Sequence, residues 1–144
     1  MSTRSFIGIL NENQTVDFIY CHFDGYLEHN GKILKEHWNT EVKVRELLKL
    51  GDLQSLGTEI GEKHDGNARA ISYEQKEKIK NWCCAYGRDI DKYENNDLTL
   101  HDNVGIAEYK WKKDESISFV YLFSPMVSEW LVCSFDTGGE FKNF

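Results

Sequence analysis

The pattern of apolar and polar positions near the start of the chain predicts two β-strands joined by a short turn. Residues 6–10 are apolar apart from one glycine, and in residues 15–21 every second position carries a large apolar or aromatic side chain, at Val16, Phe18 and Tyr20. The polar residues 11–14 separate the two runs. Alternation with a period of two on both sides of a polar turn is typical of a β-hairpin. We therefore expect residues 6–10 to pair with residues 15–21.

Farther along the chain, the apolar spacing changes to that of α-helices. In residues 31–38 the larger side chains recur three and four positions apart and are candidates for the core, namely Ile33, Leu34, His37 and Trp38. Asn39 or Thr40 can cap a second helix with its side-chain oxygen, and Gly51 can end it. That helix would carry one apolar stripe, formed by Val44, Leu47 and Leu48. Both helices can pack on the predicted sheet.

The middle of the chain is less regular. Residues 57–69 contain glycines, mixed charges and few apolar side chains, which favours a mobile loop. Residues 72–75, Ser-Tyr-Glu-Gln, have the form of a capping box and predict a short helix to about Lys80. Residues 82–86 fit either a helical face or a buried strand, and we favour the strand. Residues 87–102 are polar and predict a loop.

The last part of the chain holds three more strand-like runs, residues 106–111, 116–123 and 129–135. The polar residues 112–115 form the first break, and the second break contains Pro125, which cannot donate to a strand ladder. Strands, then helices, then strands predict one α+β domain over residues 1–144. Its mostly antiparallel sheet would have about five or six strands, packed with about two or three helices.

Composition says more about the possible partners of the protein than about its fold. The chain has 144 residues, enough for one compact core, and its 8 Phe, 7 Tyr and 4 Trp argue against disorder. The formal net charge is −7, which disfavours direct binding to nucleic acid or to an anionic membrane. An acidic face can still block a basic partner protein.

The cysteines and the N-terminal residues predict a compartment. The four cysteines show no regular disulfide framework, at Cys21, Cys83, Cys84 and Cys133. The first residues lack the apolar core of a signal peptide, and no window approaches the roughly 18 apolar residues of a membrane span. We therefore expect reduced cysteines, a cytoplasmic protein and no membrane partner.

The densest group of chemically versatile side chains is residues 20–26, Tyr-Cys-His-Phe-Asp-Gly-Tyr, at the end of the predicted hairpin. His22 and Asp24 would offer a donor and a carboxylate beside the rings of Tyr20 and Tyr26, an arrangement suited to a base or a sugar. Alternatively, the Asp-Gly pair only makes a turn, His22 bonds a backbone carbonyl and the rings fill the core. The residue pattern leaves both interpretations open.

A second candidate is Arg88, which follows Gly87 in the run Tyr-Gly-Arg-Asp. A forked guanidinium beside a flexible glycine suits a phosphate or a carboxylate, and Arg4 also flanks a predicted strand end. The alternative is an ion pair within the chain, between Arg88 and Asp89. The candidate ligand-binding residues are therefore Arg4, Tyr20, His22, Asp24, Tyr26 and Arg88, and one site formed by them requires that they converge in space.

Metal binding and nucleophilic catalysis have less support in the sequence. Possible metal ligands lack the spacing of zinc sites, at Cys21, His22, His37, Cys83, Cys84, His101 and Cys133. A cysteine–histidine dyad is disfavoured at Cys21 and His22, because neighbours on a strand point to opposite faces. The chain has no P-loop, nucleophile elbow or dinucleotide fingerprint. We expect no metal, no cofactor and no catalytic residue.

Three blocks of the sequence resemble one family. They are Ser2-Thr3-Arg4-Ser5-x-Ile7-Gly8, Ile19-Tyr20-Cys21-His22-Phe23-Asp24-Gly25-Tyr26 and Asn30-Gly31-Lys32-Ile33-Leu34-x-x-His37. The similarity continues through residues 50–57, 85–89 and 121–123 and at Trp130. The chain is similar to small proteins without an assigned activity that phages, prophages and plasmids of bacteria carry. It departs from them at Phe23, where Trp is usual, and at residues 90–92, where the family often has Arg-Gly-Glu.

The resemblance implies a mobile element in the bacterial cytoplasm, and small accessory proteins of such elements often antagonise host defences. We therefore expect a phage or mobile-element protein that binds a host defence protein or sequesters a nucleotide signal. Two alternatives are an enzyme acting on a nucleotide or phosphoester, with His22 and Asp24 as acid and base, and a structural or assembly protein of a phage. Self-association into a homo-oligomer stays open.

Overall fold

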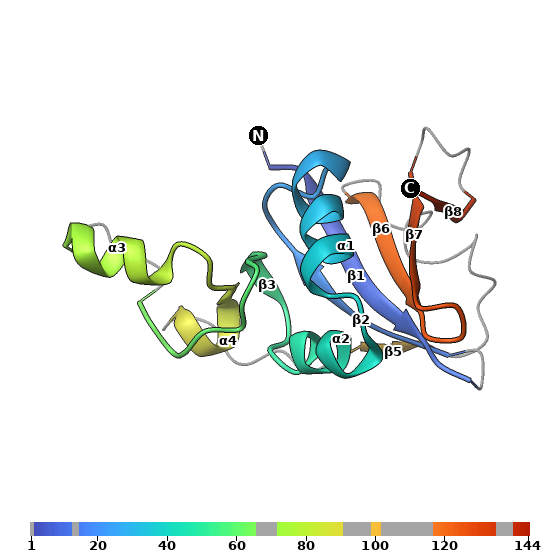
Figure 1. Cartoon of the computed structure of the whole chain (residues 1–144), viewed down its shortest axis with the longest axis horizontal. Coiled ribbons are helices and arrows are strands. Elements are labelled where there is room, and N and C mark those ends of the chain that lie inside the picture. Colours follow the sequence, from blue (N-terminus) through green and yellow to red (C-terminus); the bar gives the residue numbers. More distant parts are fainter. Residues whose placement is uncertain (1, 13–14, 66–71, 91–98, 102–116, 135–139) are drawn as a thin grey trace.

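A mostly antiparallel β-sheet forms the centre of the fold, and helices pack on one of its faces (Figure 1). The computed structural model describes residues 2–12, 15–65, 72–90, 99–101, 117–134 and 140–144. Sheet and helices together make an α+β fold, as the sequence predicted. The predicted strand at residues 106–111 and the predicted turn at residues 112–115 lie outside the described residues.

The predicted hairpin is confirmed. β1 (Arg4–Leu10) and β2 (Val16–Cys21) pair in antiparallel fashion, with Phe6 opposite Tyr20. Successive side chains of a strand point to opposite faces, so β1 presents Phe6 to one face of the sheet and Ile7 to the other. Both side chains are buried, because both faces of this hairpin are covered.

Further strands extend the hairpin on both sides. β6 (Ile117–Ser124) lies parallel to β1, and β7 (Glu129–Cys133) and β8 (Lys142–Asn143) follow, each antiparallel to its neighbour. On the other side, β3 (Leu53–Ser55) lies parallel to β2, and β4 (Cys84–Ala85) lies antiparallel to β3. The strand order is β4-β3-β2-β1-β6-β7-β8, and β5, over residues Thr99–His101, pairs with β2 off this path.

The strand predictions succeeded for the long strands and failed for the short ones. β6 and β7 confirm the runs at residues 116–123 and 129–135, with a turn between them. β3, β5 and β8 have two or three residues each, too few to show an alternating pattern, so the sheet has more strands than expected. β4 supports the strand interpretation of residues 82–86. The loop predicted for residues 87–102 was wrong at both ends, where α4 (Tyr86–Asp89) and β5 lie.

Two helices follow the hairpin, as predicted. α1 (Lys32–His37) continues from a short π-helix, η1 (Leu27–Gly31), which the apolar spacing did not reveal. α2 (Glu41–Leu48) begins after Thr40, whose hydroxyl accepts a backbone N–H of the first turn. Gly51 follows in the left-handed region, with φ of 75°, and lets the chain turn toward β3. No helix within the described ranges is both long and apolar enough to cross a membrane.

The larger core lies between these helices and the face of the sheet that carries Ile7. It contains buried apolar side chains from both layers, including Ile9, Ile19, Leu34, Val44, Leu47 and Leu48. Trp38 is buried, as predicted, and its indole N–H donates to the carbonyl of Gly57 over 3.0 Å. The prediction of a core position for His37 was wrong: α1 ends there, and its side chain is 45% exposed.

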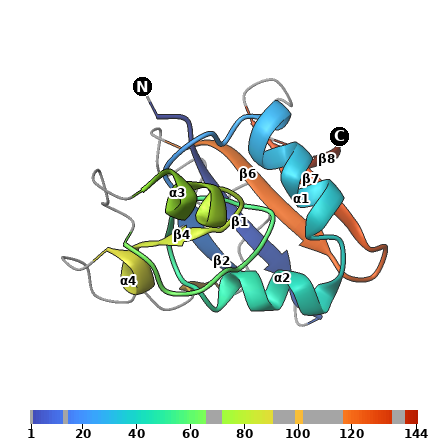
Figure 2. The ribbon, with the colours of Figure 1, turned by 60° about the vertical axis from the view of Figure 1, so that its left-hand side comes forward.

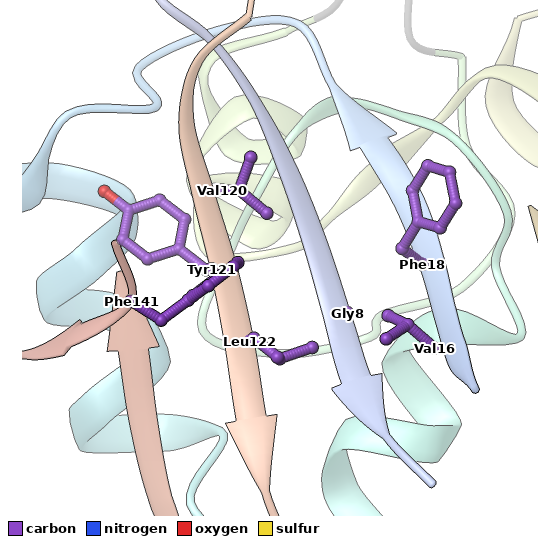
Figure 3. A pocket seen from close by; sticks show the side chains of 7 residues that line it. All are labelled: Gly8, Val16, Phe18, Val120, Tyr121, Leu122 and Phe141. Carbon is purple, nitrogen blue, oxygen red and sulfur yellow. The ribbon is translucent and has the colours of Figure 1, made fainter. Parts of the chain in front are cut away.

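The opposite face of the sheet buries a second apolar layer, formed by Phe6, Val16, Phe18, Ile117, Val120, Leu122 and Cys133. Figure 3 shows a gap in this layer beside Gly8, where a Cβ would come within 2.8 Å of the carbonyl of Asp17. The gap measures about 10 Å³, which is room for about one water molecule at most. This gap is therefore a packing feature of the sheet, too small for a ligand.

The segment from Gly57 to α4 packs at the β3–β4 edge of the sheet. α3 (Tyr73–Ile79) begins with the predicted capping box at Ser72 and projects away from the sheet, with none of its residues buried (Figures 1 and 2). Residues 57–65 are irregular, as expected for a loop. They are nevertheless held by backbone hydrogen bonds, since Cys83 donates to the carbonyl of Glu59 over 2.9 Å.

Candidate functional site

Three of the candidate residues meet where β1 begins and β2 ends. Ser5 and Cys21 are the last paired residues of the hairpin, so Arg4 and His22 come next on the two strands. Positions two apart on a strand share a face, which places His22 on the face of Tyr20, opposite to the helices. The fold thus brings Arg4, Tyr20 and His22 together, and these three form what we call the Arg4 cluster.

The imidazole of His22 has a hydroxyl at each nitrogen. The Tyr20 hydroxyl lies 2.6 Å from Nδ1, and the Ser2 hydroxyl lies 3.2 Å from Nε2. A hydroxyl can donate or accept, so both contacts suit a neutral ring. The ring of Phe23 packs edge-on against the imidazole, with centroids 4.5 Å apart, and is itself 39% exposed. An orientated imidazole and an accessible aromatic ring therefore lie side by side.

Electrostatics also favours the neutral imidazole. Partial burial lowers the pKa of His22 below its ordinary value of 6.5, and the positive charge of Arg4 lowers it further. The Arg4 cluster therefore contains one permanent positive charge rather than two at neutral pH.

One nitrogen of the Arg4 guanidinium, Nε, is not satisfied by the described part of the chain. This nitrogen is buried, and it has no hydrogen-bond partner among the described residues. Buried polar groups in folded proteins almost always have a partner, and a charged donor without one is especially costly. An acceptor from outside the chain, in particular an anionic oxygen, would remove this cost.

Asp24 and Tyr26 stand apart from the Arg4 cluster. Asp24 has φ of 57° and an exposed side chain, and the N–H of the following Gly25 donates to the carbonyl of Thr3 over 2.8 Å. The structure thus shows the turn that was one interpretation of the Asp-Gly pair. Tyr26 is 39% exposed, and its ring lies 6.0 Å from that of His29. In the described part of the chain, neither side chain forms a hydrogen bond or ion pair with Arg4 or His22.

Cys21 points into the core, as its position beside His22 on the strand predicted. The amide of Asn30, which is fully buried, donates to the Cys21 Sγ over 3.4 Å and to the carbonyl of Phe23 over 3.2 Å. Burial raises the pKa of the thiol to about 12. Cys21 is therefore a protonated packing residue at neutral pH, and it ties η1 to the end of β2.

Arg88 forms the intramolecular ion pair that was the alternative interpretation. Its Nε donates to both carboxylate oxygens of Asp89, over 2.9 and 3.0 Å. Its Nη2 donates to the carbonyls of Ile60 and Cys83, each over 2.9 Å. The guanidinium therefore fastens the loop at residues 57–65 to β4 and α4, and its polar contacts within the described residues lie among residues 60–89.

The fold also gathers three possible metal ligands that the sequence pattern did not connect. Atoms of His64, Cys84 and Asp89 lie within 4.8 Å of one another. The hydrogen bonds of Asp89 explain this arrangement without a metal, since the carboxylate accepts from the backbone N–H of His64 and of Ala85 besides Arg88. A cation here would face the Arg88 guanidinium, and burial raises the pKa of Cys84 to about 11. We assign the group to the stabilisation of the loop.

Comparison of the chain with known proteins finds no matching family model, no matching curated protein and no matching solved structure.

Proposed function

We propose that this protein acts by binding rather than by catalysis, and that its ligand is an anion with a ring system, such as a nucleotide. The observation that carries the proposal is the buried Nε of Arg4, which lacks an acceptor in the described part of the chain. A phosphate oxygen would supply this acceptor through a charge-assisted hydrogen bond. The accessible ring of Phe23, which packs against the imidazole of His22, would contact the ring of the ligand.

The contacts of His22 support binding over catalysis. Both ring nitrogens of His22 already have a hydroxyl group at hydrogen-bond distance. Neither nitrogen is therefore free to exchange a proton with a substrate. The neighbouring thiol of Cys21 points into the core and stays protonated, and the carboxylate of Asp24 is not hydrogen-bonded to the imidazole in the described structure. An acid–base pair made of His22 and Asp24 is therefore not assembled.

The energetics set the size of the expected affinity. Stacking of a base on an aromatic ring contributes about 1–3 kcal/mol, and a hydrogen bond to a charged group about 1.5–3 kcal/mol. The net charge of −7 opposes an anion at long range, so the attraction acts at contact distance. Together these two terms contribute about 2.5–6 kcal/mol, which corresponds to dissociation constants from about 10 mM to tens of micromolar, so sequestration requires an abundant protein.

In its biological setting, we place the protein in the cytoplasm of a bacterial host, as the product of a phage or another mobile element. Sequestration of a nucleotide signal would antagonise a host defence system. This part of the proposal is supported by the resemblance of residues 2–8, 19–26 and 30–37 to proteins of such elements. Direct blockade of a host defence protein is the second mode, and it becomes the better account if the protein holds no small ligand.

Mass spectrometry of small molecules released by denaturation tests the proposal. The protein is purified from bacterial cells beside Arg4→Ala and a matched control, Lys43→Ala, which removes an exposed positive charge on α2. We expect a nucleotide-like anion from the unaltered protein and from the control but not from Arg4→Ala. Incubation of the identified compound with the protein then distinguishes a binding protein from an enzyme, because conversion to a product would favour the enzyme.

A second measurement covers the case in which no small molecule is released. If nothing is released, a panel of nucleotides is tested by calorimetry. Failure of the whole panel to bind, with the protein folded, would contradict the ligand proposal and favour blockade of a partner protein.

A further inference from the structure

A cleft lies at the end of the hairpin opposite to the Arg4 cluster. Its walls come from the β1–β2 turn, from α2 and from the β6–β7 turn, which meet at the lower edge of Figures 1 and 2. The cleft has a volume of about 970 Å³. Because β1 has 7 residues, this end lies about 20 Å from Arg4, at roughly 3.3 Å per residue. The cleft is therefore separate from the proposed ligand site.

A network around Arg45 holds two walls of the cleft together. The guanidinium donates from Nε to Glu41 over 2.9 Å and from Nη2 to the side-chain oxygen of Asn11 over 3.0 Å. Its Nη1 lies 3.6 Å from a carboxylate oxygen of Asp17, which also accepts from the Asn11 amide over 3.3 Å. The network links α2 to the β1–β2 turn, and it holds the carboxylates of Asp17 and Glu41 in place without a partner.

The charge of the cleft is not balanced by its own residues. Among the described residues of the lining, Glu12, Asp17 and Glu41 supply three carboxylates, whereas Arg45 is the one positively charged side chain. Arg45 is already paired with Asp17 and Glu41, and Glu12 is exposed. The cleft therefore has an excess of negative charge that favours a positively charged partner and repels nucleic acid.

The third wall adds an apolar surface. Pro125 and Met126 line the cleft at the tip of the β6–β7 turn, and Met126 is 92% exposed. The next residue, Val127, is 60% exposed, so two consecutive residues of this turn expose apolar side chains. A flexible thioether next to a charged cleft is a common feature of surfaces that accept apolar side chains of a protein.

We infer that this cleft binds a basic, partly apolar segment of a partner protein. Lys or Arg side chains of the segment pair with Glu12 and Glu41, and an apolar side chain packs on Pro125 and Met126. The combination requires a polypeptide, because a simple cation would leave the apolar tip uncovered and an anionic lipid surface would be repelled. The volume accommodates several side chains, which is enough for a short segment rather than a whole domain.

The test uses a defined probe, a short fluorescent peptide of alternating Lys and Leu, and fluorescence anisotropy with the full chain. We expect Glu12→Lys and Met126→Ser each to weaken binding by about tenfold. The matched controls lie on α3, where Glu74→Lys makes the same charge change and Tyr73→Ser replaces another exposed large side chain. The controls and Arg4→Ala should bind the peptide as the unaltered protein does.

Each contrary result overturns the inference. Equal weakening by Glu74→Lys would show an effect of net charge alone, and equal binding of a peptide with Ser in place of Leu would exclude the apolar contact. Loss of peptide binding in Arg4→Ala would show that the peptide binds at the Arg4 cluster and not in the cleft. Sedimentation that shows a dimer dissociated by Met126→Ser would assign the cleft to a second copy of the chain. None of these results depends on whether a nucleotide binds.

Discussion

Arg4 and Arg88 both flank strand ends and both suit an anion, but the fold gives their guanidinium groups opposite surroundings. Arg88 reaches into the irregular loop at residues 57–65, where carbonyls not used by a strand ladder are available, and it donates to Ile60 and Cys83 besides Asp89. Arg4 lies over a sheet, whose carbonyls point sideways to neighbouring strands. Its Nε has no acceptor in the described part of the chain. The backbone around an arginine therefore decides whether the group is structural or ready for a ligand.

This contrast extends to the regions around the two residues. Around Arg88, the carboxylate of Asp89 and two backbone N–H groups complete a buried network that fastens a loop. Around Arg4, the partners of His22 are hydroxyl groups of Ser2 and Tyr20, and Phe23 remains accessible. We therefore expect substitutions near Arg88 to change stability and substitutions near Arg4 to change binding.

The largest effect is expected for Trp38→Ala, which sets the scale for the comparison. The substitution removes a buried indole and its hydrogen bond to the carbonyl of Gly57, and should lower the free energy of unfolding by roughly 3–5 kcal/mol. His22→Ala in the Arg4 cluster should cost less than about 1 kcal/mol. Urea unfolding followed by circular dichroism measures both. Similar losses would mean that the Arg4 cluster is a structural element.

Asp89→Asn tests the Arg88 side of the comparison. It removes the negative charge from a fully buried carboxylate and leaves the Arg88 guanidinium without its counter-ion, which should cost about 3 kcal/mol. Asp24→Asn is the matched control, since Asp24 is exposed and Asn tolerates its positive φ. Thermal melts of the two variants should differ by several degrees. Equal melting temperatures would show that the Arg88–Asp89 pair does not stabilise the fold.

Arg4→Met should separate stability from binding. Met keeps the apolar length of the side chain and removes the buried Nε that lacks an acceptor, so the free energy of unfolding should not fall and should rise slightly. Affinity for the anion identified by mass spectrometry should fall at least about tenfold, because the charge-assisted hydrogen bond is lost. Calorimetry and urea unfolding of the same preparation measure both quantities. Unchanged affinity would break the contrast between the two arginines.

The smallest effect concerns the pKa of His22. Because this pKa lies below 6.5 in the folded protein, the unfolded chain binds more protons just below pH 6.5. The contribution of His22 to stability is therefore complete above pH 6.5 and declines as the pH falls toward the folded pKa. Arg4→Met removes one cause of the shift, so the His22 pKa should rise toward its ordinary value in an NMR titration. Anion binding should also raise it, and no change in either experiment would place Arg4 away from the imidazole.

The fold was predictable wherever local spacing determined it. The hairpin, α1, α2 and β6 each contain enough residues for a period of two or of three to four to appear. β3 and β4 are too short for any period, and their pairing depends on contacts between residues more than 25 positions apart. The loop at residues 57–65 contains few apolar side chains, and hydrogen bonds to distant carbonyls, which no local pattern encodes, hold it in place.

The candidate site was predictable in part, for a similar reason. The juxtaposition of Arg4 and His22 follows from the hairpin register, once residue 5 is known to face residue 21. The neighbouring positions of Arg88 and Asp89 indicated the ion pair, but Ile60 and Cys83 could not be foreseen as acceptors. His64 was missed because it lies in the predicted loop, and the capping of Thr40 and Ser72 was visible in the residue types alone.

The central position of β1 has a consequence for how the chain folds during synthesis. Its pairing with β2 uses residues close in sequence, whereas its pairing with β6 joins Phe6 to Val120. A nascent chain that has emerged only as far as α3 therefore leaves one edge of β1 without its partner strand. Folding rates fall as contacts become more distant in sequence, so completion of this sheet should be slow, in the range of milliseconds to seconds. During that interval, the open edge of β1 is the place where chaperones would act first.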